Sequence, residues 1–165
     1  GKVLLCGCPP EAYASSWLRR MVAYVPPEPV IWEGTVKDNL LAGKDEADNV
    51  LFKVLDDFDF HTAFPDRKDW EILKLPIRKK GENLSGGQKQ RIGLARGWLS
   101  GASVLLIDEA TNSIDHEGEE RIVRFLCRAD RTVCMTTHHR ELSKCFDKVI
   151  DMENKRGFRG EGVRK

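Results

Sequence analysis

Two acidic side chains that follow a short apolar run are the residues of this sequence best suited to chemistry. Val104 to Ile107 is wholly apolar, and Asp108 and Glu109 come directly after it. Such a run predicts a buried strand, and open α/β sheets bind ligands at the carboxyl ends of their strands. One carboxylate could hold Mg²⁺, directly or through water, and the next could orient or deprotonate a water molecule. The alternative is an acidic pair that only ends a strand and caps a turn.

A second candidate segment is Leu84-Ser85-Gly86-Gly87-Gln88. Ser85 and Gln88 have the spacing of a capping box, which predicts that a helix begins here. The start of a helix offers unpaired N–H groups, and two glycines remove side chains that would keep a phosphate away from the backbone. The segment is therefore either a phosphate contact or a plain capped helix after a tight turn.

A third candidate is His138, which follows an apolar run from Thr132 to Met135. If this run is the next strand of the same sheet, the imidazole lies at the same carboxyl edge as the acidic pair. A histidine at such a place can act on a ligand, or it can be a hydrogen-bonded structural residue.

Strands that alternate with helices must position these three segments. Strands are expected over 3–6, 21–25, 103–107, 132–135 and 148–152, and helices over 35–43, 48–58, 85–99, 116–128 and 141–145. This alternation predicts an α/β fold with a parallel sheet covered by helices on both faces. Residues 61–82 are charged and expected to be irregular surface, and the basic, glycine-rich tail 154–165 is expected to fray.

Composition excludes several classes of protein. The 165 residues fit one domain, and 27 Lys+Arg against 26 Asp+Glu leave a charge of +1, so no nucleic-acid partner is expected. No apolar run approaches the roughly 20 residues that cross a bilayer. The five cysteines show no metal-binding spacing and are expected to be free thiols in a reducing compartment.

Taken together and in order, the segments resemble the nucleotide-binding domain of ATP-binding-cassette (ABC) proteins. Residues 84–91 match the family signature, 104–109 the Walker B strand, 112–115 the D-loop and 137–138 the switch-histidine loop. Residues 24–40 look like the Q-loop region of exporter-type ABC transporters, including the multidrug-resistance-associated kind. The resemblance implies a mostly parallel sheet like that of P-loop NTPases, with a helical subdomain over about 36–99, a core over 100–153 and a tail over 154–165.

The resemblance also implies roles for individual residues. Asp108 would serve a Mg²⁺ site, and Glu109 and His138 would be catalytic. Asp115 would lie at a dimer seam, and the nucleotide of a partner domain would be contacted by Ser85, Gly86, Gly87 and Gln88. ATP and Mg²⁺ are the implied cofactors. A second nucleotide-binding domain and a transmembrane domain are the implied partners, which places the chain at the cytosolic face of a membrane.

Two departures from the family pattern stand out. No phosphate-binding loop of the form G-x-x-x-x-G-K-[ST] occurs in the sequence, and the family order would place it upstream of Gly1, so an N-terminally truncated domain is expected. Pro27 stands where the family has the Q-loop glutamine. Because proline has no side-chain amide for Mg²⁺ or water, the usual link between nucleotide and membrane domain is expected to be weak here, or to depend on the partner domain.

Two other functions are also compatible with these motifs. A soluble ABC ATPase of DNA repair or translation would share the motifs, although the near-neutral charge and the exporter-like residues 29–40 favour the exporter. A degenerate module that only lends its signature to a partner would explain Pro27 and the missing loop, whereas Glu109 and His138 favour an ATPase.

For the 165 residues alone, we expect neither tight ATP binding nor hydrolysis. Most phosphate contacts in a P-loop enzyme come from the backbone N–H groups and the lysine of that loop, which this sequence does not contain. Calorimetric titration of the purified chain with ATP checks the expectation, and micromolar affinity would contradict it.

Overall fold

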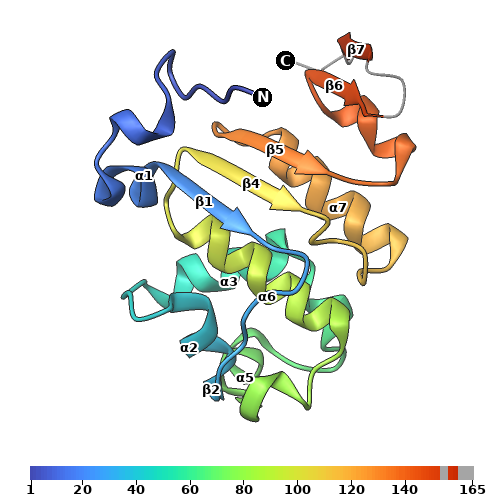
Figure 1. Cartoon of the computed structure of the whole chain (residues 1–165). Helices are drawn as coiled ribbons and strands as arrows, with labels where there is room; N and C mark the ends of the chain where they lie inside the picture. The colour runs from blue at the N-terminus through green and yellow to red at the C-terminus, as the bar shows by residue number, and fades with distance from the viewer. Residues whose placement is uncertain (153–155, 160–165) are drawn as a thin grey trace.

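A parallel three-stranded sheet forms the centre of the protein in the computed structural model, which describes residues 1–152 and the backbone of 156–159 (Figure 1). The strands are β1 (Val22–Val25), β4 (Val104–Asp108) and β5 (Thr132–Thr136), in the order β1-β4-β5. Val25 pairs with Ile107, and Ile107 pairs with Met135. The expected α/β fold with a parallel sheet is confirmed.

Helix α6 (Gly86–Leu99) lies against the sheet face that contains Val25, Leu105 and Ile107, all of which are buried. A Cβ atom added to Gly97 would lie 2.6 Å from a methyl group of Val25, so only glycine permits this close approach. On the opposite face, Tyr24 is 58% exposed. In the described part of the chain the sheet is therefore covered on one face, and the expectation of cover on both is wrong.

Further elements lie around α6 (Figure 1). They are α2 (Val36–Leu41), α3 (Asp48–Asp57), α4 (Phe60–Ala63), α5 (Asp69–Lys74), α7 (His116–Cys127) and the short pair β2 (Gly34–Thr35) with β3 (Pro76–Ile77). Thr35 caps α2 in the expected box with Asp38. Phe58 packs against Trp98 of α6 and Phe125 of α7, and this aromatic cluster joins the helices. The helices predicted over 48–58, 85–99 and 116–128 are confirmed within one residue at every end.

Two predictions for the first half of the chain are wrong. Residues 3–6 form no strand, because Cys6 and Gly7 both have positive φ and turn the chain so that Leu5 and Cys8 pair with each other. The chain then forms η1 (Pro10–Ala12) and α1 (Ser15–Met21). Residues 61–82, expected to be irregular, contain α5 and β3, whose Ile72 and Ile77 enter the core.

The C-terminal part contains η3 (Arg140–Cys145), β6 (Lys148–Asp151) and β7 (Arg156–Arg159). Strand β7 pairs with β6 in antiparallel orientation, so the expected fraying of the tail is wrong for residues 156–159. The rest of the predicted tail, 154–155 and 160–165, lies outside the described residues. The boundaries proposed for the helical subdomain and the core stay a prediction.

A buried ion network joins α6 and Asp59, which lies between α3 and α4, to α7. The Arg91 side chain on α6 is only 4% exposed, and its Nη2 lies 2.9 Å from Asp59 Oδ2 and 3.0 Å from Asp115 Oδ2. Arg121 of α7 reaches the second oxygen of Asp59 at 2.8 Å. Buried charges depend on their partners, because an uncompensated ion in the interior is costly.

We expect Asp59→Asn to lower the free energy of unfolding by about 3 kcal/mol, because it leaves Arg91 short of a counterion. Asparagine tolerates the positive φ of residue 59, so the substitution tests charge and not backbone strain. Urea unfolding of the purified protein measures the loss. The control Glu117→Gln removes a carboxylate that is 84% exposed, and its effect should stay within about 0.5 kcal/mol. Equal effects of the two substitutions would contradict the prediction.

Candidate functional site

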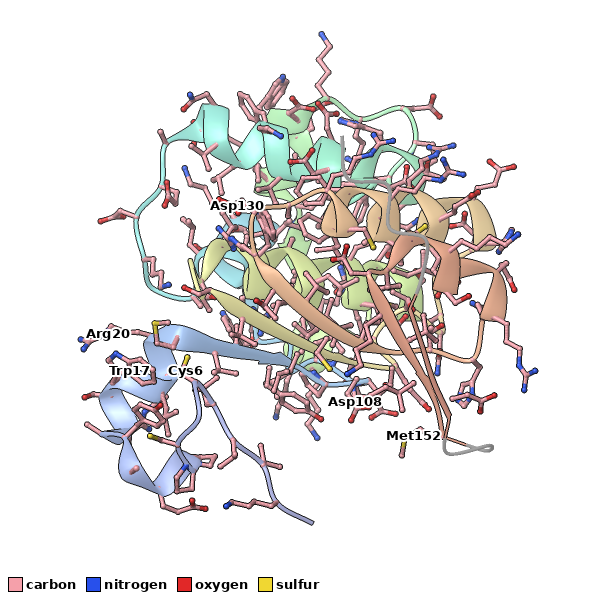
Figure 2. The ribbon with its side chains drawn as sticks, turned by 90° about the horizontal axis from the view of Figure 1, so that it is seen from above. Cys6, Trp17, Arg20, Asp108, Asp130 and Met152 are labelled. Atoms are coloured by element: carbon pink, nitrogen blue, oxygen red, sulfur yellow. The ribbon has the colours of Figure 1, made fainter. Side chains whose placement is uncertain are left out.

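The carboxylate of Asp108 is fixed at the end of the central strand by one hydrogen bond from each neighbouring strand. The Tyr24 hydroxyl of β1 donates to Oδ2 at 3.0 Å, and the Thr136 hydroxyl of β5 donates to Oδ1 at 2.9 Å. The hydrogen bond to Asp108 raises the pKa of Tyr24 above its ordinary value, so the phenol stays a donor. Figure 2 shows Asp108 at the tip of the sheet, well away from Cys6 and Trp17 of the N-terminal segment.

Glu109 is held beside Asp108 by three contacts. Its backbone N–H donates to the Thr136 hydroxyl at 3.0 Å, and its carboxylate lies 2.7 Å from His138 Nε2 and accepts from Asn112 Nδ2 at 3.2 Å. The carboxylate is 38% exposed and the imidazole 74%. The structure therefore brings Asp108, Glu109 and His138 together, because the carboxyl ends of paired parallel strands meet at one edge.

The start of α6 is built as predicted, and Gln88 makes one further hydrogen bond. Ser85 caps the helix in a box with Gln88, and the Gln88 amide also donates to the carbonyl of Ala63 at 2.8 Å. Ser85 and Gly86 are exposed, whereas Gly87 is buried. A Cβ atom at Gly87 would lie 2.7 Å from the carbonyl oxygen of Ser113. Gly87 is thus required by the packing of the loop, while Ser85 and Gly86 present the helix start at the surface.

Asp115 ends the loop formed by residues 112–115 and caps α7. Its Oδ1 accepts from the N–H of Gly118 at 2.9 Å, and its Oδ2 contacts Arg91. These two contacts, first the N–H and then the guanidinium, hold the pKa of the Asp115 carboxyl below its usual range. Among the described residues, no hydrogen bond joins Ser85–Gln88 directly to Asp108 or Glu109. The loop of residues 112–115 contacts the start of α6 through Ser113 and contacts Glu109 through Asn112.

Comparison with known proteins supports the same interpretation. Residues 1–112 match the family described as ABC transporter. The chain belongs to the ABC transporter family. It is 32% identical over 159 residues to a lactococcin transport/processing ATP-binding protein, LcnC-like, of Lactococcus lactis, covering 93% of this chain and 21% of that protein. It is 33% identical over 163 residues to an ATP-dependent lipid A-core flippase of Xanthomonas euvesicatoria, covering 94% of this chain and 27% of that protein.

A solved structure of a bacterial Atm1-family ABC exporter with ATP bound also resembles the chain. The TM-score is 0.75 at 25% identity, and the match covers 91% of this chain and 27% of the exporter chain. The expected resemblance to the nucleotide-binding domain of exporter-type ABC proteins is confirmed. The chain spans about a fifth to a quarter of the length of these relatives. Throughout residues 1–152 and 156–159, no helix has both the length and the apolar character needed to span a bilayer.

For an ABC protein, Asp108 is a suitable Mg²⁺ ligand. Each of its oxygens accepts one hydrogen bond, and a carboxylate has about four acceptor positions, so room is left for an ion. In nucleotide sites Mg²⁺ is held by one or two carboxylates together with water and phosphate oxygens, and this donor fits that pattern. No cluster of three or more His, Cys, Asp or Glu that could hold a metal occurs among the described residues.

Three residues of this ABC site were missed by motif-based reasoning. Thr136 touches both acidic residues, Tyr24 holds Asp108, and Gln90 hydrogen-bonds to the carbonyl oxygen of Pro27 at 3.2 Å. The available signal was strand register: Tyr24 and Thr136 lie on the strands that flank Asp108, and a parallel sheet sets such residues side by side. Pro27 itself is exposed, and it takes part through its backbone carbonyl.

If Asp108 holds Mg²⁺ in an ATPase, Thr136→Val should lower ATP hydrolysis by the complete protein about 10- to 100-fold, as is typical when the hydrogen-bond partner of a metal ligand is lost. Valine keeps the shape and the strand preference of threonine but cannot bond to Asp108 or to the N–H of Glu109. Steady-state hydrolysis at several Mg²⁺ concentrations is the measurement. Thr132→Val, at the other end of β5, is the matched control and should be silent. Activity within twofold of the parent would show that Thr136 does not orient the site.

Proposed function

We propose that the chain is the ATP-binding and ATP-hydrolysing domain of an ABC membrane exporter, acting at the cytosolic face of the membrane. The observation that carries the proposal is the Glu109 carboxylate, held between His138 and Asn112 beside the hydrogen-bonded Asp108. The names of the relatives, a transport/processing ATP-binding protein and a lipid A-core flippase, and the exporter structure favour export over a soluble role.

The residues of the sheet edge have complementary parts in this proposal. Glu109 accepts a proton from the water that attacks the γ-phosphate, and His138, whose Nε2 lies against Glu109, would contact that phosphate. Asp108 would hold Mg²⁺, which would supply positive charge that stabilises the phosphate oxygens. Thr136 and Tyr24 keep the Asp108 carboxylate from rotating.

The exposed start of α6 serves a second site. Ser85 and Gly86 are exposed, so the start of the helix lies at the surface. Helix starts bind anions through their backbone N–H groups, which suits the phosphates of a nucleotide bound by another domain. We infer a head-to-tail pair of nucleotide-binding domains, with Asp115 at the seam and the phosphate loop supplied from outside these 165 residues. Closure of this pair would then drive the movement of a transmembrane domain that exports the substrate. Phosphoryl transfer depends chiefly on positioning and charge stabilisation, so a site assembled by closure is physically reasonable.

We expect Glu109→Gln in the complete transporter to lower steady-state hydrolysis of MgATP by about 10²- to 10⁴-fold, because the amide keeps the shape but cannot accept the proton. Nucleotide binding should persist, and the closed dimer should accumulate with ATP. Steady-state assays measure hydrolysis, equilibrium binding of labelled ATP measures nucleotide affinity, and cross-linking between the two nucleotide-binding domains in ATP measures the closed dimer.

The control Glu120→Gln removes an exposed carboxylate paired with Arg124 on α7 and should leave hydrolysis unchanged. Turnover by Glu109→Gln within twofold of the parent would show that Glu109 is not the base. That result would favour a non-hydrolysing module that lends its signature to a partner.

A further inference from the structure

The side chain of Gln90 bridges two loops that lie far apart in the sequence. Gln90 is 5% exposed, its Nε2 donates to the carbonyl of Pro27 at 3.2 Å, and its Oε1 accepts from the backbone N–H of Ser113 at 2.7 Å. Pro27 follows β1, and Ser113 lies in the loop after β4. Both ends of one buried amide are thus satisfied by backbone groups of different loops.

The segment on the Pro27 side is held firmly against α6. A Cβ atom at Gly93 would lie 2.6 Å from the ring of Pro29. Arg96 donates to the carbonyls of Val30 and Asn39, each at 2.8 Å, and burial lowers the pKa of Arg96 to about 10. At that pKa the guanidinium remains charged at neutral pH, so these hydrogen bonds persist.

The loop on the Ser113 side reaches the catalytic carboxylate. Asn112, the residue before Ser113, donates to Glu109 Oε2 at 3.2 Å. Fixing the N–H of Ser113 therefore also fixes the backbone from which the Asn112 amide extends. A continuous line of contacts runs from the Pro27 carbonyl through Gln90, Ser113 and Asn112 to Glu109.

We propose that Gln90 is a positioning residue that couples the Pro27 segment to Glu109 through Ser113 and Asn112. The coupling uses the backbone carbonyl of residue 27, so it operates although proline has no side-chain amide. The kinetic consequence rests on the proposed ATPase function, whereas the structural link does not. Gln90 keeps Asn112 on the Glu109 carboxylate and makes that contact depend on where the Pro27 segment lies.

A double-mutant cycle in the complete transporter tests the kinetic consequence, with MgATP as the probe. Gln90→Met keeps a side chain of similar length but loses both hydrogen bonds, and we expect kcat to fall about 3- to 10-fold with KM within twofold. Asn112→Ala should lower kcat similarly. The double variant should be no slower than the slower single variant, because both act on one contact. Multiplying effects would overturn the proposal.

Arg131→Met is the matched control for a general weakening of α6. It loses a 2.6 Å hydrogen bond to the Trp98 carbonyl and a contact with the Trp98 ring, both at the C-terminal end of α6. It should leave kcat unchanged, and its effect should multiply with that of Asn112→Ala. A fall in kcat equal to that of Gln90→Met would assign the effect to helix stability and overturn the proposal.

Hydrogen exchange tests the structural link whether or not the protein hydrolyses ATP. Gln90→Met should speed amide exchange in residues 112–115 and 30–33 at least threefold. Gln90→Glu retains the acceptor for Ser113 but loses the donor to Pro27, so only 30–33 should exchange faster. Unchanged exchange in both loops would overturn the proposal. If the Gln90 variants show these exchange changes but the parent protein does not hydrolyse ATP, the proposed function is refuted and the bridge through Gln90 still stands.

Discussion

The buried guanidinium of Arg91 is the interaction on which the arrangement of this domain depends. It lies on α6, four residues beyond Gly87, and it holds Asp59 from the helical region and Asp115 from the loop after the central strand. Among the described residues its Nε is the buried side-chain polar atom that has no partner, so the ion is already incompletely satisfied. Because an unpaired buried charge is costly, α6, the segment that carries Asp59 and the loop that ends at Asp115 must keep their relative positions.

Because its position is fixed in this way, α6 can have two functions. Its exposed start presents Ser85 and Gly86 outward, while its inner side orders the loop that touches Glu109. In the proposed function, the same helix would serve a nucleotide bound by a partner domain, and it orders the loop beside the Glu109 carboxylate. The sheet contributes the other constraint, because parallel pairing of β1, β4 and β5 fixes which side chains surround Asp108 without any contribution from the loops.

Sequence could predict the parts of the site that depend on local chemistry. The capping box of Ser85 and Gln88, the strand ending in Asp108, and the meeting of Glu109 with His138 all follow from spacing and from parallel pairing. It could not show that the Gln88 amide is taken up by the Ala63 carbonyl, or that Gln90 spans two loops, since both depend on tertiary packing. The turn at Cys6 was missed because an apolar run looks the same in a strand and in an exposed segment.

Glu109 adopts a left-handed backbone conformation, with φ of 48°. An L-residue with a Cβ atom pays about 1 kcal/mol in this region, whereas glycine or asparagine occupies it at little cost. Thermostability and turnover thus favour different residues at one position. Selection for folding stability alone would favour glycine or asparagine at this position, and that change would remove the proposed base. An engineered stable variant of this domain must therefore be checked at residue 109 before its loss of activity is attributed to rigidity.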